Sequence, residues 1–161
     1  MTPDYQFYHG ALLHEIVITA GSELRIELRN LHGRADAYVL DGSVGLLIKH
    51  STMRITPWTF TFAKEHVDEL RALRTGTKVC FVGFVCGDDG FVCVRDADLV
   101  SILSPTEKDV ASVRVERRPR KMYRVSSGGK DFPGKIARGV EEILSELKRH
   151  STEYAPPSSA K

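Results

Sequence analysis

The order of apolar and polar residues in the first third of the chain predicts one helix followed by three strands. Apolar residues recur at helical spacing from Asp4 onward, and Asp4 is a candidate cap for that helix. The segment ELRIELR at 23–29 then alternates strictly between apolar and charged residues, which is typical of a half-exposed strand. ADAYVL at 35–40 and VGLLIKHS at 44–51 favour two more strands, and Asp41-Gly42 between them favours a hairpin with a two-residue loop.

The middle of the chain predicts a helix enclosed by strands. TPWTFTF at 56–62 is extended, and its aromatic residues alternate so that they share one core-facing side. A helix is expected at about 63–73, followed by KVCFVGFVC at 78–86, the most apolar run and therefore the expected central strand. Asp89-Gly90 favours a tight turn into the strand FVCVR, which precedes a short helix at 98–103.

The C-terminal third combines a basic strand pair with an amphipathic helix. VRVERRPRKMYRV at 113–125 predicts two strands interrupted at Pro119, and a proline without an N–H places this pair at a sheet edge. The apolar stripe of FPGKIARGVEEILSELKRH at 132–150 predicts a helix. Residues 151–161 are polar and rich in Pro and Ser, so we expect a disordered tail after a single globular domain at 1–150.

This order of elements places the chain in the α/β (α+β) class. We expect a single mixed β-sheet flanked by helices, with an αβββαβ-like core, a basic C-terminal hairpin and a final helix. A chain of 161 residues with 42% hydrophobic and 27% charged residues has the ordinary composition of one globular domain.

The cysteine pattern and the hydropathy of the chain indicate the cellular compartment in which we expect the protein to work. Cys80, Cys86 and Cys93 lie in apolar strand patterns without C-x-x-C spacing, so we interpret them as reduced core residues rather than metal ligands. No segment resembles a signal peptide or approaches the ~18 apolar residues of a membrane-spanning helix. We therefore expect a cytoplasmic protein without a membrane partner.

The distribution of charge provides the first functional signal. The net charge of +2 is too small to indicate a nucleic-acid-binding protein by itself, but six of the eleven residues from Arg114 to Arg124 are basic. A strand pair that follows phosphates would show this pattern, and so would a solvated charged hairpin. If nucleic acid is the partner, the candidate contact residues are Arg114, Arg117, Arg118, Arg120, Lys121 and Arg124.

Lys49 provides the second signal, because it interrupts an apolar strand pattern. A buried ammonium needs a partner or a route to water. With a two-residue loop, at Asp41-Gly42 or one residue later, strand parity places Asp36 on the same sheet face as Lys49, within about 5 to 8 Å. A three-residue loop would reverse the parity and separate the two side chains. The alternative is a lysine whose stem covers apolar surface and whose head reaches water.

The predicted order of elements is a helix, a three-stranded antiparallel meander, a helix and a strand, with Asp36 on the second strand and Lys49 on the third. Over residues 4–87 this order resembles the restriction-endonuclease-like core of the PD-(D/E)XK superfamily. The resemblance implies that Asp36, Lys49 and Glu15 are catalytic: the carboxylates would hold Mg²⁺, and the lysine would position a water beside the scissile phosphate. Leu47 stands where the family has another carboxylate. The resemblance therefore implies an atypical or inactive site with little or no Mg²⁺-dependent cleavage.

The chain also resembles an uncharacterised bacterial protein family in four segments, Y-H-G, I-K-H-S, P-W-T-F-T-F and V-C-G-D-D-G. This resemblance implies no activity. We interpret Asp88 and Asp89 in the last segment as turn residues, and His9 and His50 as structural.

Together these signals favour a nucleic-acid-associated protein with a nuclease-like but atypical or inactive site. The alternative is a non-enzymatic protein-interaction module in which the same residues are structural. The sequence identifies no cofactor, and it leaves the oligomeric state open.

Overall fold

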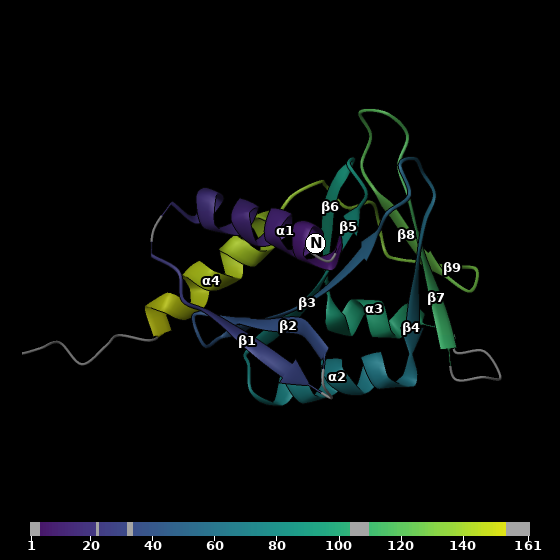
Figure 1. The fold of residues 1–161 in the computed structure, drawn as a ribbon. Helices are drawn as coiled ribbons and strands as arrows, with labels where there is room; N and C mark the ends of the chain where they lie inside the picture. Colours follow the sequence, from purple (N-terminus) through teal and green to yellow (C-terminus); the bar gives the residue numbers. More distant parts are fainter. Residues whose placement is uncertain (1–3, 22, 32–33, 104–109, 154–161) are drawn as a thin grey trace, which may run out of the picture.

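A computed structural model of the chain describes residues 4–21, 23–31, 34–103 and 110–153, with only the backbone described at 30, 31, 34–36, 152 and 153. These residues form two sheets and four helices (Figure 1). In chain order the elements are α1 (Asp4–Ala20), β1 (Ile26–Leu31), β2 (Arg34–Leu40), β3 (Val44–Ser51), β4 (Trp58–Ala63), α2 (Lys64–Thr75), β5 (Val79–Cys86), β6 (Gly90–Arg95), α3 (Asp96–Ile102), β7 (Val110–Glu116), β8 (Arg124–Ser127), β9 (Lys130–Asp131) and α4 (Glu141–Glu153).

The larger sheet is mixed and has five strands in the order β1-β2-β3-β5-β6. Its neighbouring strands are antiparallel except β3 and β5, which run parallel from Val44 opposite Val79 to Ser51 opposite Cys86. Parallel neighbours require a crossover connection, and β4 with α2 supplies it. The carboxyl ends of β3 and β5 therefore meet at one edge of the sheet.

Helices cover both faces of the larger sheet (Figure 1). α1 and α4 pack on one face through a core that includes Leu12, Ile16 and Ile143. α2, α3 and the smaller antiparallel sheet, β4-β7-β8-β9, pack on the other face. Two covered faces explain why β3 and β5 read as almost continuous apolar runs. None of the described helices is long and apolar enough to span a membrane.

The cysteines and the aromatic stripe lie in the core, as the sequence predicts. Trp58, Phe60 and Phe62 are buried between the two sheets. The three cysteines are buried and free, and burial raises the pKa of each thiol. At neutral pH they are protonated and behave as small hydrophobic side chains.

The α+β class with a mixed sheet is confirmed, but the expectation of a single sheet is wrong. β4 is not part of the larger sheet. It pairs antiparallel with β7, from Trp58 opposite Val115 to Ala63 opposite Val110. The basic hairpin, β7 and β8, therefore belongs to a second sheet that packs against the first. Its position is what brings the basic residues close to the end of β3.

The final helix begins later than the sequence pattern predicts. Tyr123 and Ile136 exchange two backbone hydrogen bonds, with N–O distances of 2.8 and 2.9 Å. Gly134 and Gly139 have φ of +79° and +127°, which are outside the helical region. These contacts hold residues 132–140 as an extended linker, so that α4 starts at Glu141. α4 continues to Glu153, and the rest of the expected tail lies outside the described residues.

A buried carboxylate holds α4 on the larger sheet. Glu146 on α4 is 5% exposed, and its Oε1 accepts a hydrogen bond of 2.8 Å from Nη2 of Arg95 on β6. His150, one turn later, lies 3.1 Å from Oε2. The hydrogen bond from Arg95 lowers the pKa of Glu146 below its usual value, although burial opposes this shift.

We predict that Glu146→Gln lowers the free energy of unfolding by about 2 kcal/mol at pH 7, because the charged hydrogen bond is lost inside the core. A lowered pKa contributes stability above the ordinary glutamate pKa of 4.5, and this contribution is lost as the pH falls through the folded-state pKa. Urea unfolding at pH 7 and at pH 3 should show the difference between the two proteins shrinking. Glu142→Gln, at an exposed position on the same helix, is the matched control. An unchanged difference at the two pH values would contradict this role.

Candidate functional site

Lys49 lies near the end of β3, on the strand face that packs toward β4 and α2. Its Nζ is 4.9 Å from the centroid of the Phe62 ring and 3.5 Å from Nδ1 of His66. Leu47, two residues earlier, is part of the same core. The side chain is half-buried, so its ammonium is met by an aromatic face and an imidazole nitrogen as well as by water. These contacts account for a lysine within an apolar strand.

His66 connects this lysine to the start of α2. Its Nδ1 accepts a hydrogen bond of 2.9 Å from the backbone N–H of Ala63, which precedes the helix. The nitrogen that accepts this bond carries no hydrogen, so the neutral ring holds its hydrogen on Nε2. Glu69, three residues later, is 2% exposed on the buried side of the helix. The sequence analysis did not single out Glu69, although its place beside Leu70 on the apolar stripe is a detectable signal.

A small cavity of about 150 Å³ adjoins Lys49 on the side of α1. It is lined by Tyr5, His9, Ile48, Lys49 and His50. His9 is buried, and its Nδ1 lies 3.0 Å from the hydroxyl of Tyr38. His9 and His50 thus line the same cavity near the end of β3. The ring of His50 stacks on Tyr8 and meets the ring of His9 edge-on, so both histidines are packed against neighbouring rings.

The hairpin before Lys49 does not have the predicted two-residue loop. Leu40 pairs with Val44, so the loop contains the three residues Asp41 to Ser43. Ala37 is opposite Leu47 in this register. This is the register in which strand parity separates Asp36 from Lys49, so the basis for the predicted pairing is removed. Asp36 is in β2, but its side chain lies outside the described part of the structure.

The residues around Lys49 do not fit a magnesium ion. Leu47 is 1% exposed and cannot coordinate a metal. Glu15 lies about 9 Å further along α1 than His9 by helical rise, and is not among the described residues that line the cavity. Among the described side chains, no group of three or more His, Cys, Asp or Glu is arranged to hold a metal ion. Mg²⁺ requires several oxygen ligands in near-octahedral geometry.

The six predicted phosphate-binding cations fall into two groups. Arg114, Arg117 and Arg124 form ion pairs with Glu116, Asp89 and Asp131, respectively. Arg118, Arg120 and Lys121 are exposed in the β7–β8 loop, and no ion pair is described for them. Charge already neutralised by a carboxylate is less available to a phosphate. The loop cations are therefore the stronger candidates.

Asp89 does more than close a turn. Its backbone N–H bonds to the carbonyl of Cys86 in the tight turn that the sequence predicts. Its carboxylate also accepts bonds from Arg117, with Nη2–Oδ1 at 3.1 Å and Nε–Oδ2 at 3.0 Å, and from the Tyr123 hydroxyl at 2.5 Å. The Arg117 guanidinium lies 5.1 Å from the centroid of the Tyr123 ring. Burial, and then the bond to Asp89, raises the pKa of Tyr123.

The β3–β4 loop packs beside the β7–β8 loop. Thr56 Oγ1 accepts a bond of 3.2 Å from the backbone N–H of Arg117. The two loops border a groove of about 360 Å³, lined by Arg54, Ile55, Thr56, Trp58, Asp89, Arg117, Pro119 and Arg120. The sequence analysis missed Arg54, which becomes part of this site only because the two sheets pack together. We call the exposed cations Arg54, Arg118, Arg120 and Lys121 the basic loop surface.

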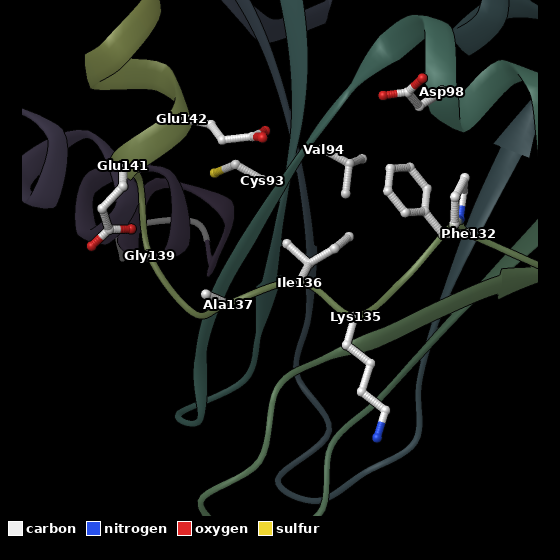
Figure 2. A pocket seen from close by; sticks show the side chains of 11 residues that line it. Cys93, Val94, Asp98, Phe132, Lys135, Ile136, Ala137, Gly139, Glu141 and Glu142 are labelled. Carbon is white, nitrogen blue, oxygen red and sulfur yellow. The ribbon is translucent and has the colours of Figure 1, made fainter.

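A different cavity, of about 290 Å³, lies against β6 and is bordered by the extended linker and α4 (Figure 2). Its carboxylates, Asp98, Glu141 and Glu142, outnumber its one ammonium, Lys135. Such a lining repels phosphate. Burial raises the pKa of Cys93 on its wall to about 12, so this thiol is not a nucleophile at neutral pH. We therefore place the candidate functional site at the basic loop surface and the adjacent end of β3.

No protein-family model and no curated protein sequence matches the chain. Among solved structures, the chain is similar to Hjc, a Holliday junction resolvase from the archaeal hyperthermophile Archaeoglobus fulgidus. The two share 16% sequence identity at a TM-score of 0.43, over 70% of this chain and 88% of the other. The function therefore has to be argued from the side chains of this chain, and the bacterial family resemblance stays a prediction.

We predict that His66→Ala lowers the free energy of unfolding by about 1 kcal/mol, because the backbone N–H of Ala63 loses its acceptor at the start of α2. His66→Gln should keep most of the stability, since a glutamine at this position can reach back to the same N–H. Urea unfolding at neutral pH measures both. Equal losses in the two variants would mean that the imidazole acts through packing and not through this hydrogen bond.

Proposed function

We propose that the protein binds nucleic acid through the basic loop surface. The observation that carries this proposal is the division of the cations: half of the basic hairpin residues are paired with carboxylates, whereas Arg118, Arg120 and Lys121 project from the loop. Arg54 from the β3–β4 loop extends the same surface. Exposed cations without an ion pair among the described residues are available to phosphates, as phosphate binding requires.

The place of this surface in the fold supports the proposal. Both loops adjoin the edge where the parallel strands β3 and β5 end, which is the usual place for ligand sites in sheets that contain parallel strands. Lys49 lies at the end of β3, five residues before Arg54.

We further propose that this neighbouring site is nuclease-like in its element order but atypical in its chemistry, with Lys49 at its centre and without the Asp36 partner that the hairpin register separates from it. Lys49 contacts Phe62 and His66, and the buried Leu47 leaves β3 without the carboxylate that a metal site there would use. The proposal is therefore binding without Mg²⁺-dependent cleavage. The buried, unpaired thiols favour a reducing, cytoplasmic setting.

A second candidate function is protein interaction through the same loops. It is favoured by Met53, Ile55 and Met122, which are exposed beside the cations. Methionine and arginine are both enriched in protein interfaces. The dependence of binding on salt and on charge distinguishes a nucleic acid from an apolar protein partner.

We predict that Arg118→Glu/Arg120→Glu weakens binding to a short DNA duplex at least tenfold at low salt. The magnitude of the slope of log affinity against log salt should fall by about 0.9 for each phosphate of the duplex that the variant no longer neutralises. Fluorescence anisotropy over a salt series measures both quantities. Arg71→Glu/Lys148→Glu, which makes the same charge change at exposed positions on α2 and α4, is the matched control and should bind nearly as the wild type does.

The nucleic-acid proposal fails if the wild-type protein does not bind DNA or RNA at low salt. It also fails if the control pair weakens binding as much as the loop pair does, because the effect would then come from net charge alone.

We predict no Mg²⁺-dependent cleavage of bound DNA or RNA by the wild-type protein, because the described carboxylates do not form a site with enough oxygen ligands. Incubation of end-labelled duplex and single strands with Mg²⁺ or Mn²⁺ tests this directly. Lys49→Ala serves as the companion variant. Cleavage by the wild type that disappears in Lys49→Ala would contradict the prediction.

A further inference from the structure

The basic loop surface carries exposed apolar side chains between its cations. Ile55 is 72% exposed, Met53 is 57% exposed and Met122 is 47% exposed. In the sequence they alternate with charge, as Met53-Arg54-Ile55 and as Lys121-Met122. Single exposed apolar side chains are ordinary, but several of them on two loops that pack side by side mark a contact surface.

The β3–β4 loop, which carries Met53 and Ile55, is held in place by contacts of the Met53 backbone. The backbone carbonyl of Met53 accepts a bond of 2.9 Å from Nε1 of the buried Trp58, and its N–H lies 3.3 Å from Oγ of Ser51. A Cβ added to Gly87 would lie 2.1 Å from that same carbonyl, so the β5–β6 turn supports the loop closely. Met53 and Ile55 are therefore presented to solvent by a loop whose backbone is held at Met53.

This combination of groups restricts the ligand. Phosphates alone would be bound by the cations and would leave Ile55 and the two methionines exposed. A protein partner would have to supply acids for four cations that form no ion pair among the described residues. A nucleic-acid duplex accommodates both the cations and the apolar side chains. The cations contact its phosphates, and an aliphatic side chain inserts between its bases, as in proteins that insert apolar wedges into a duplex.

We propose that Ile55, with Met53 in the same loop and Met122 in the β7–β8 loop, is a wedge that inserts between bases at a weakly stacked position of a duplex. This inference rests on the proposed nucleic-acid function and names its substrate class, a duplex with a local defect such as a bulge or mismatch. Insertion separates two stacked base pairs, and this costs least where stacking is already broken. The cations bind any duplex, and the wedge selects the defective one.

The test compares the affinity of the wild-type protein for a matched duplex and for the same duplex with a one-nucleotide bulge, at one fixed salt concentration. The expected preference for the bulged duplex is about tenfold. Ile55→Ala should abolish most of this preference, because it weakens binding to the bulged duplex much more than binding to the matched duplex. Ile55→Met, which keeps a large apolar side chain, should retain the preference for the bulged duplex. Ile18→Ala, which truncates an isoleucine that is 60% exposed on α1, is the matched control.

A second readout follows the insertion itself. 2-Aminopurine placed beside the bulge is quenched by stacking, so its fluorescence should rise with the wild-type protein and not with Ile55→Ala. Circular dichroism confirms that the variants, which change only exposed side chains, keep the fold.

The outcomes separate the inference from the function on which it rests. Equal affinity for the two duplexes, or a preference that survives Ile55→Ala, overturns the wedge and leaves nucleic-acid binding intact. An equal loss of affinity for both duplexes in Ile55→Ala also overturns it, because the side chain would then not be selective. No binding to either duplex overturns the proposed function and the wedge together.

Discussion

The carboxylate of Asp89 joins the two sheets of this protein at the point on which the candidate site depends. It belongs to the β5–β6 turn of the larger sheet, and it accepts hydrogen bonds from Arg117 and Tyr123 of the basic hairpin in the smaller sheet. The Arg117 backbone in turn bonds to Thr56 in the β3–β4 loop. Through this chain of contacts, three connections that are far apart in sequence meet at one edge. Arg54 would not neighbour Arg120 without it.

The same packing explains the environment of Lys49. Because β4 leaves the larger sheet and crosses over its face, Phe62 and the start of α2 are placed above the end of β3. The ammonium then finds an aromatic face and the His66 nitrogen. A cation held in this way, in a protein whose neighbouring loops expose Arg54, Arg118, Arg120 and Lys121, favours the binding of anions over the binding of Mg²⁺. This electrostatic setting agrees with a nucleic-acid contact and with the lack of a fitting metal site among the described residues.

The sequence predicts most helices and strands because their periodicity is local, whereas the errors arise where distant contacts decide. Asp41-Gly42 indicated a two-residue loop, but Asp41 bonds to Arg25 and the carbonyl of Ser43 accepts the N–H of Lys78, so that Ser43 is drawn into the loop. The alternation from Trp58 to Phe62 indicated a buried face without identifying β7 as its partner. The basic segment was evident in the sequence, but which of its cations are neutralised depends on carboxylates up to 28 residues away.

The central claim is that nucleic acid meets the protein at the two loops beside β3. Backbone amide chemical shifts of isotope-labelled protein, recorded by NMR during titration with a short DNA duplex, test it most directly. The account predicts that the largest changes fall at residues 53–56 and 118–122, at the edge where β3 and β5 end. Largest changes on α1, on α4 or at the acidic cavity beside β6, or no changes at saturating DNA, would contradict it.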